Sequence, residues 1–161
     1  MPKDSAPTVR LMTDYETHLH WSGSTAGGIR SYSRSHTATA PPAATSVDLS
    51  ADPAFRGEAD RLNPEQLVVM AASSCQMLSF LGAAARAGVT VLAYSDDATS
   101  RLDTTARPPR LDPVQLDVTV RVAAGTDEAT VHDLAEQAHR GCFVANSLAT
   151  PVRVQTTVVT A

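Results

Sequence analysis

Cysteine is scarce in this chain, which contains only two in 161 residues, Cys75 and Cys142. Neither has a neighbouring pair of Cys or His residues at the spacing that zinc sites use, so the sequence predicts no zinc site. Residues 1–10, MPKDSAPTVR, contain no apolar core, and we therefore expect no signal peptide and a cytoplasmic location. Thiols stay reduced in that compartment, so we expect free or reactive cysteines rather than a structural crosslink.

Charge is also sparse, and it has no strong excess of either sign. Charged residues make up 19% of the chain against 43% hydrophobic residues, which indicates a globular protein rather than a disordered one. The net charge of −4 argues against non-specific binding to nucleic acid or to acidic membranes. No internal repeat is present. We expect a single domain over residues 1–161, with residues 1–8 as a loose N-terminus.

The longest apolar run, residues 62–88, predicts a long central helix. Pro64 suits the first helical position, and Gly88 suits the position just past the helix end. Charge is absent from residues 66–85, and a helix that is apolar on every face belongs in an interior. Its serines and glutamine count against a membrane span. Because one chain of this size cannot cover such a helix well, the sequence predicts a homodimer.

Alternation of apolar and polar residues predicts strands on both sides of this helix. Strands are expected at residues 9–21, 29–38, 47–49, 89–99, 99–105, 111–124 and 152–158. A second helix is expected to be capped by Thr126 and to end at Gly141, followed by a short turn over residues 143–150. Residues 114–122 are apolar on one face and polar on the other, which is typical of antiparallel sheets. The element order predicts an α+β domain in which a curved sheet wraps on the helices.

Cys75 lies at the centre of the apolar helix, where burial would raise the pKa of its thiol and keep it unreactive. A reactive thiolate would need a nearby cation, and arginine stays charged when buried. The candidates are Arg30, Arg34 and Arg56, and Glu65 could orient the guanidinium by bidentate pairing. There are plainer alternatives. Cys75 would then be a small buried hydrophobe, and Glu65 would only favour the positive end of the helix dipole.

Helix geometry limits how Glu65 and Cys75 can share a site. Ten residues of straight helix give about 15 Å of rise and leave the two side chains about 80° apart around the axis. They therefore cannot touch within one straight helix. Either the helix breaks between them, or Glu65 comes from a partner subunit.

Several short motifs resemble the OsmC/Ohr family of hydroperoxide-reducing proteins. They are NPEQL at residues 63–67 with Ala72 and Cys75 after it, AHRGCFVANS at 138–147, the preceding stretch AFRGEADRLNPEQL, and the early hairpin HWSGSTAGGIRSYSRSHTA. The resemblance runs from about Tyr15 to Val158. It departs from the family pattern at Phe143, where many members have proline, and it is closest to the OsmC-like branch.

The resemblance implies an intertwined homodimer with curved antiparallel sheets around long central helices and two sites at the subunit interface. Cys75 would attack an organic hydroperoxide, and Cys142 would resolve the resulting sulfenic acid to a disulfide. Glu65 would hold a catalytic arginine, for which Arg56 and Arg34 are the first candidates. An external dithiol, either a small molecule or a lipoylated protein, would reduce the disulfide. No cofactor, metal, nucleic acid or membrane is implied.

Two other readings of the cysteines stay open at this point. The protein could be a non-catalytic thiol redox sensor or a small-molecule-binding protein on the same fold, or a structural dimer with inert cysteines. The leading hypothesis is a dithiol-dependent peroxidase. The apolar residues of the central helix would suit an alkyl or lipid-like peroxide better than hydrogen peroxide.

Overall fold

The computed structural model describes residues 13–161, which divide into two compact units at the boundary between Asn63 and Pro64. The expected loose terminus at residues 1–8 and the start of the first expected strand lie outside the described residues. The prediction of one domain over the whole chain stays a prediction.

The first unit contains a small antiparallel sheet in the order β1-β2-β3. Its strands are β1 (His18–His20), β2 (His36–Thr39) and β3 (Ser46–Leu49). The predicted hairpin is confirmed, with β1 and β2 paired antiparallel, but both strands are much shorter than expected. Residues 22–35 instead form turns closed by local bonds such as the one from the Gly28 N–H to the Thr25 carbonyl, because this glycine- and serine-rich stretch favours turns over a ladder.

A polar loop joins β3 to the second unit, and it holds a short 3₁₀ helix, η1 (Pro53–Phe55). The Asp52 side chain caps η1 by accepting from the Ala54 N–H, and Arg56 ends it in the left-handed conformation at φ 70°. Gly57 is required next, since a Cβ there would lie 1.5 Å from the Ala51 carbonyl oxygen. The loop is therefore folded tightly upon itself.

The predicted central helix is confirmed as α1 (Pro64–Arg86), an unbroken helix of 23 residues. Gly88 adopts φ 72° and the Val89 N–H bonds back to the Ala84 carbonyl, which is the helix ending that a glycine at this position favours. Within residues 13–161, α1 is the one helix with the length and hydropathy to cross a membrane, and 28% of its most apolar window is buried. Its buried residues are Ala72, Gln76, Phe80, Ala83 and Ala84.

The second unit is built on a three-stranded sheet in the order β4-β7-β8. Its strands are β4 (Val91–Thr99), β7 (Val114–Val122) and β8 (Val152–Thr160), and a separate pair is formed by β5 (Leu102–Asp103) and β6 (Arg110–Leu111). β7 buries alternate residues, as predicted. It pairs antiparallel with β4 but parallel with β8, because the chain crosses over through helices between β7 and β8.

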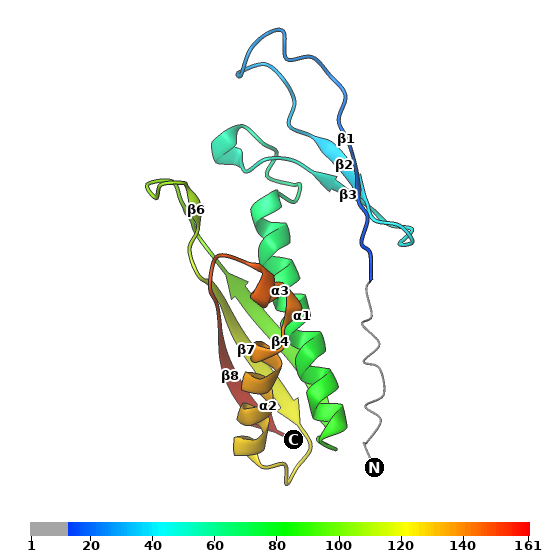
Figure 1. Ribbon diagram of the computed structural model, residues 1–161, viewed down its shortest axis with the longest axis vertical. Coiled ribbons are helices and arrows are strands. Elements are labelled where there is room, and N and C mark those ends of the chain that lie inside the picture. Colours follow the sequence, from blue (N-terminus) through cyan, green and yellow to red (C-terminus); the bar gives the residue numbers. More distant parts are fainter. Residues whose placement is uncertain (1–12) are drawn as a thin grey trace, which may run out of the picture. The chain divides into compact units, whose positions relative to one another are not determined.

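The crossover consists of α2 (Glu128–Arg140) and α3 (Phe143–Ser147). Asp127, not Thr126, caps α2, since its carboxylate accepts from the Thr130 N–H at 2.9 Å. The expected turn after Gly141 is also wrong in part, because five of its residues form α3. In Figure 1, α1 and α2 lie side by side on one face of the sheet, where they enclose the core of this unit.

Two polar contacts join α1 to its neighbours inside the second unit. The Ser73 hydroxyl donates to Asp96 on β4, and the buried Gln76 side chain donates to the Ala135 carbonyl of α2 at 3.2 Å. Burial raises the pKa of Asp96, and the charges of Asp117 and Asp97 add to the rise, although the bond from Ser73 opposes it. These contacts fix the rotation of α1, and with it the direction in which Cys75 points.

Candidate active site

The structure brings the two cysteines together, although they are far apart in the sequence. Cys75 lies in the middle of α1, and Cys142 lies at the junction of α2 and α3. Both are free, and they lie close enough that each thiol acts on the pKa of the other. This pairing is the arrangement that an attacking thiol and a resolving thiol would need.

The break between α2 and α3 places Cys142. Gly141 ends α2, and the Cys142 N–H bonds to the His139 carbonyl at 3.2 Å. Cys142 then adopts an extended backbone and caps α3, with its Sγ accepting from the Ala145 N–H at 3.5 Å. Its residue is 1% exposed, whereas Cys75 is only partly buried. A reagent from solvent would therefore reach Cys75 first.

The surroundings of Cys75 favour its thiolate. Burial pushes the pKa of Cys75 up, but hydrogen bonds to its sulfur outweigh burial and hold the pKa below its usual value. These bonds come from the Cys142 thiol, the backbone N–H groups of Val144 and Phe143, and the Ser79 hydroxyl. Two N–H groups at the start of α3 thus face the sulfur, where partial positive charge stabilises an anion.

The surroundings of Cys142 have the opposite effect. Burial raises the pKa of Cys142, and so do its hydrogen bond to Cys75 and the negative charge of the Cys75 thiolate. The bonds from the Ala145 and Val144 N–H groups oppose this rise without overcoming it. The two thiols therefore differ, and Cys75 loses its proton more readily than Cys142.

Glu65 does not reach this pair within one chain. α1 is continuous from Pro64 to Arg86, so the ten residues between Glu65 and Cys75 separate them by about 15 Å along the axis. The broken-helix alternative is excluded, which leaves the partner-subunit alternative as the one way for them to share a site. Among residues 64–161, Glu65 forms no ion pair.

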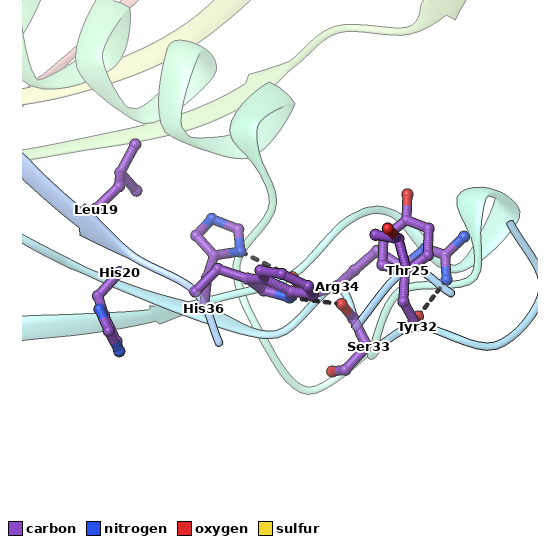
Figure 2. Close-up of a pocket in the computed structure, with 8 residues that line it drawn as sticks. Leu19, His20, Thr25, Tyr32, Ser33, Arg34 and His36 are labelled. Atoms are coloured by element: carbon purple, nitrogen blue, oxygen red, sulfur yellow. Dashed lines mark hydrogen bonds between the residues drawn. The ribbon is translucent and has the colours of Figure 1, made fainter. Parts of the chain in front are cut away.

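Arg34 is fixed inside the first unit by neutral groups. Its guanidinium donates to the Tyr32 and Ile29 carbonyls and stacks over the Tyr32 ring at 3.8 Å from the centroid. Arg34 lines a cavity of about 450 Å³ together with Tyr32, Trp21 and His36. Figure 2 shows Arg34, Tyr32 and His36 at this cavity. Within residues 13–63 no carboxylate pairs with Arg34, so its charge is uncompensated there.

Arg56 shares a second cavity with Arg34, of about 350 Å³, next to Phe55. Arg56 is exposed, and within residues 13–63 its side chain forms no ion pair. Arg30, the third candidate, is exposed and lines neither cavity. The structure therefore groups Arg34 and Arg56 and leaves Arg30 apart from them, while the catalytic role of either arginine stays a prediction.

Sequence reasoning missed the groups that act on Cys75 locally. Ser79 lies four residues after Cys75, a spacing that puts both on one face of a helix and could have suggested the contact. The N–H groups of Phe143 and Val144 carried no signal, because α3 itself was predicted as a turn. Of the histidines, His36 bonds through Nδ1 to the Arg34 carbonyl at 2.8 Å, which is a local backbone contact.

Comparisons with known proteins identify the family and the fold. The sequence model of the OsmC-like protein family matches residues 57–157. An OsmC-like protein of unknown function from Vibrio cholerae is similar in structure, with a TM-score of 0.78 and 26% identity over 92% of this chain and 100% of that one. No match was found among curated proteins.

Structures of hydroperoxide-resistance proteins share the fold. The organic hydroperoxide resistance protein OsmC from Legionella pneumophila has a TM-score of 0.67 at 17% identity, covering 92% of this chain and 98% of that one. The organic hydroperoxide resistance protein from Elizabethkingia anophelis has a TM-score of 0.70 at 17% identity, covering 95% and 100%. The fold is thus the α+β fold of OsmC-like structures. This chain belongs to the OsmC-like protein family.

Proposed function

We propose that this protein is a thiol-dependent peroxidase that reduces organic hydroperoxides through Cys75 and Cys142. The observation that carries the proposal is that the α2–α3 junction packs against α1 and brings Cys142 beside Cys75, where the pKa of Cys75 is lowered and the pKa of Cys142 is raised. A peroxidatic thiol must react as its thiolate. A resolving thiol must lie close by and keep its proton until the first step is complete.

The reaction balances with these two thiols. The Cys75 thiolate attacks one peroxide oxygen, so an S–O bond forms, the O–O bond breaks, and the alcohol leaves after taking a proton. Sulfur loses two electrons and the peroxide gains two. Cys142 then attacks the sulfenic sulfur, an S–S bond replaces the S–O bond, and water leaves with the proton of Cys142. A dithiol reductant from the cytoplasm returns both thiols.

The proposal includes a homodimer whose partner completes the site. Apolar residues near the start of α1 remain exposed, with Met70 at 52% and Leu67 at 36%, and a partner would cover them. Glu65 cannot reach Cys75 of its own chain, so in a dimer it would orient Arg56 or Arg34 near the other subunit's thiol. Light scattering at low micromolar concentration should give a dimer mass. A monomer mass with native circular dichroism would contradict this part.

The surface beside the cysteines favours an apolar substrate. Leu78 lies one helical turn from Cys75 and is 63% exposed, and Phe143, whose N–H faces the sulfur, is 83% exposed. Phe80, in contrast, points into the core against Tyr94 and does not line the thiol. The names of the hydroperoxide-resistance proteins with this fold point the same way.

Steady-state turnover tests the proposal. The protein is mixed with cumene hydroperoxide or hydrogen peroxide and with either dihydrolipoamide or a monothiol as reductant. We expect rapid turnover with the organic peroxide and the dithiol. Slow thiol loss without turnover under dithiol would instead indicate a non-catalytic redox sensor or binding protein. No thiol loss would indicate a structural dimer.

A further inference from the structure

The Asn146 side chain bridges the break between α2 and α3. Its Nδ2 group donates to the Arg140 carbonyl at 3.0 Å and to the Cys142 carbonyl at 2.9 Å, so both of its amide protons are used. The Asn146 backbone N–H also bonds to the Cys142 carbonyl, at 3.0 Å. One residue thus joins the last turn of α2 to the first turn of α3.

The bonds from Nδ2 act at the junction between the two helices. Gly141 separates the two helices, and the last carbonyls of a helix such as Arg140 have no partner within it. A short asparagine side chain with two donors can satisfy the Arg140 and Cys142 carbonyls together and fix the angle between α2 and α3.

The segment that Asn146 fixes packs directly against α1, and three of the four groups that lower the pKa of Cys75 come from it. They are the Cys142 thiol and the N–H groups of Phe143 and Val144, while the fourth, Ser79, belongs to α1. A shift of α3 relative to α2 would move these three donors together. Cys142 would move away from Cys75 in the same step, which would slow disulfide formation.

We propose that Asn146 is a positioning residue, which holds Cys142 and the first N–H groups of α3 against Cys75 through its bonds to the Arg140 and Cys142 carbonyls. It touches neither substrate nor the reacting sulfur. The inference deepens the proposed function and, for the resolving step, rests on it.

The chain offers a matched control on the same helix. Ser147 also bonds to a backbone carbonyl, from its Oγ to the Phe143 oxygen at 2.7 Å, but this bond stays within α3 and does not reach α2. Ser147→Ala therefore removes a comparable contact without releasing the junction. Asn146→Ala removes the bridge. Asn146→Asp keeps the side-chain shape but replaces both donors with acceptors that face two carbonyls.

The first measurement is the pH profile of Cys75 alkylation by iodoacetamide, with the modified peptide identified by mass spectrometry. We expect Asn146→Ala and Asn146→Asp to raise the apparent pKa of Cys75 and to slow alkylation at pH 7 roughly three- to tenfold. Ser147→Ala should match the wild type. No peroxide is involved, so this result is independent of whether the protein is a peroxidase.

The second measurement is the fate of Cys75 after a pulse of cumene hydroperoxide. We expect the Asn146 variants to give several-fold more sulfinic acid on Cys75 and less disulfide, because Cys142 arrives later. Thermal melting checks the fold, and Asn146→Gln, which keeps the donor on a longer stem, should lie between wild type and Asn146→Asp. The proposal is overturned if the Asn146 variants give the same alkylation profiles and the same product ratios as Ser147→Ala.

Discussion

Ser79→Ala tests whether local hydrogen bonds tune Cys75. The hydroxyl of Ser79 is one of four donors that hold the pKa of Cys75 below its usual value, and it lies on α1 itself, independent of α3. Its removal deletes one oxygen and leaves the helix intact. Alanine also has the highest helix propensity, so we expect no loss of fold.

The expected size follows from the bond and its exposure. A hydrogen bond to a charged group contributes about 1.5–3 kcal/mol when buried. Cys75 is only partly buried, so water replaces part of the lost bond, and we expect about 0.7–1.4 kcal/mol in this site. That corresponds to a rise of about 0.5–1 unit in the pKa of Cys75 and a three- to tenfold smaller thiolate fraction near neutral pH.

The assay is the rate of iodoacetamide alkylation of Cys75 between pH 5 and pH 10. Ser74→Ala is the control, because Ser74 is exposed on the neighbouring face of the same helix. We expect the midpoint to move up for Ser79→Ala and to stay in place for Ser74→Ala. Equal midpoints for Ser79→Ala and wild type would refute the assignment of the thiolate to a hydrogen-bonded site.

Three further predictions concern the cysteines, Glu65 and Asp96. Cys75→Ser should abolish peroxide turnover, while Cys142→Ser should allow one oxidation and trap a sulfenic or overoxidised Cys75. If mass spectrometry shows that Cys75→Ser keeps the first oxidation and Cys142→Ser loses it, the roles of the two cysteines are reversed. Glu65→Gln should slow peroxide reduction roughly ten- to a thousandfold with little change in melting temperature. Of the Arg56 and Arg34 variants, only the one that removes the true partner of Glu65 should show the same loss of rate. Normal rates in the Glu65, Arg56 and Arg34 variants would refute the interface site. The folded-state pKa of Asp96 is raised, so its contribution to stability is present at low pH and is lost as pH rises through that pKa. Asp96→Asn should therefore raise Tm at pH 7 by a few degrees and leave it nearly unchanged at pH 3, and equal shifts at both would contradict the argument.

Long periodic segments could be predicted from the sequence, and short ones could not. α1 and the buried face of β7 follow from runs of nine or more residues, and the pattern of each run fits only one type of secondary structure. The early strands were overestimated, because alternation in residues 13–17 and 29–35 was outweighed by glycine and serine turns between them. α3 was missed since its five residues carry no helical period, and its cap is a cysteine rather than a common capping residue.

The candidate site also contains some features that the sequence predicts and others that it does not. The two cysteines were evident from their scarcity and motifs, and their contact required the crossover through α2 that sets β8 parallel to β7. The continuity of α1 then excluded the broken-helix alternative for Glu65. The contributions of Phe143 and Val144 to the pKa of Cys75 could not be predicted from sequence patterns, because they come from backbone N–H groups that any residue would supply.

The most direct test of the account is the product formed by one equivalent of cumene hydroperoxide on the reduced protein. Peptide mass spectrometry without reduction would identify it within seconds of mixing. The account predicts loss of both thiols and a disulfide between Cys75 and Cys142 as the main product, restored to two thiols by dihydrolipoamide. Unreacted thiols, or a Cys75 sulfinic acid with Cys142 still reduced, would contradict it.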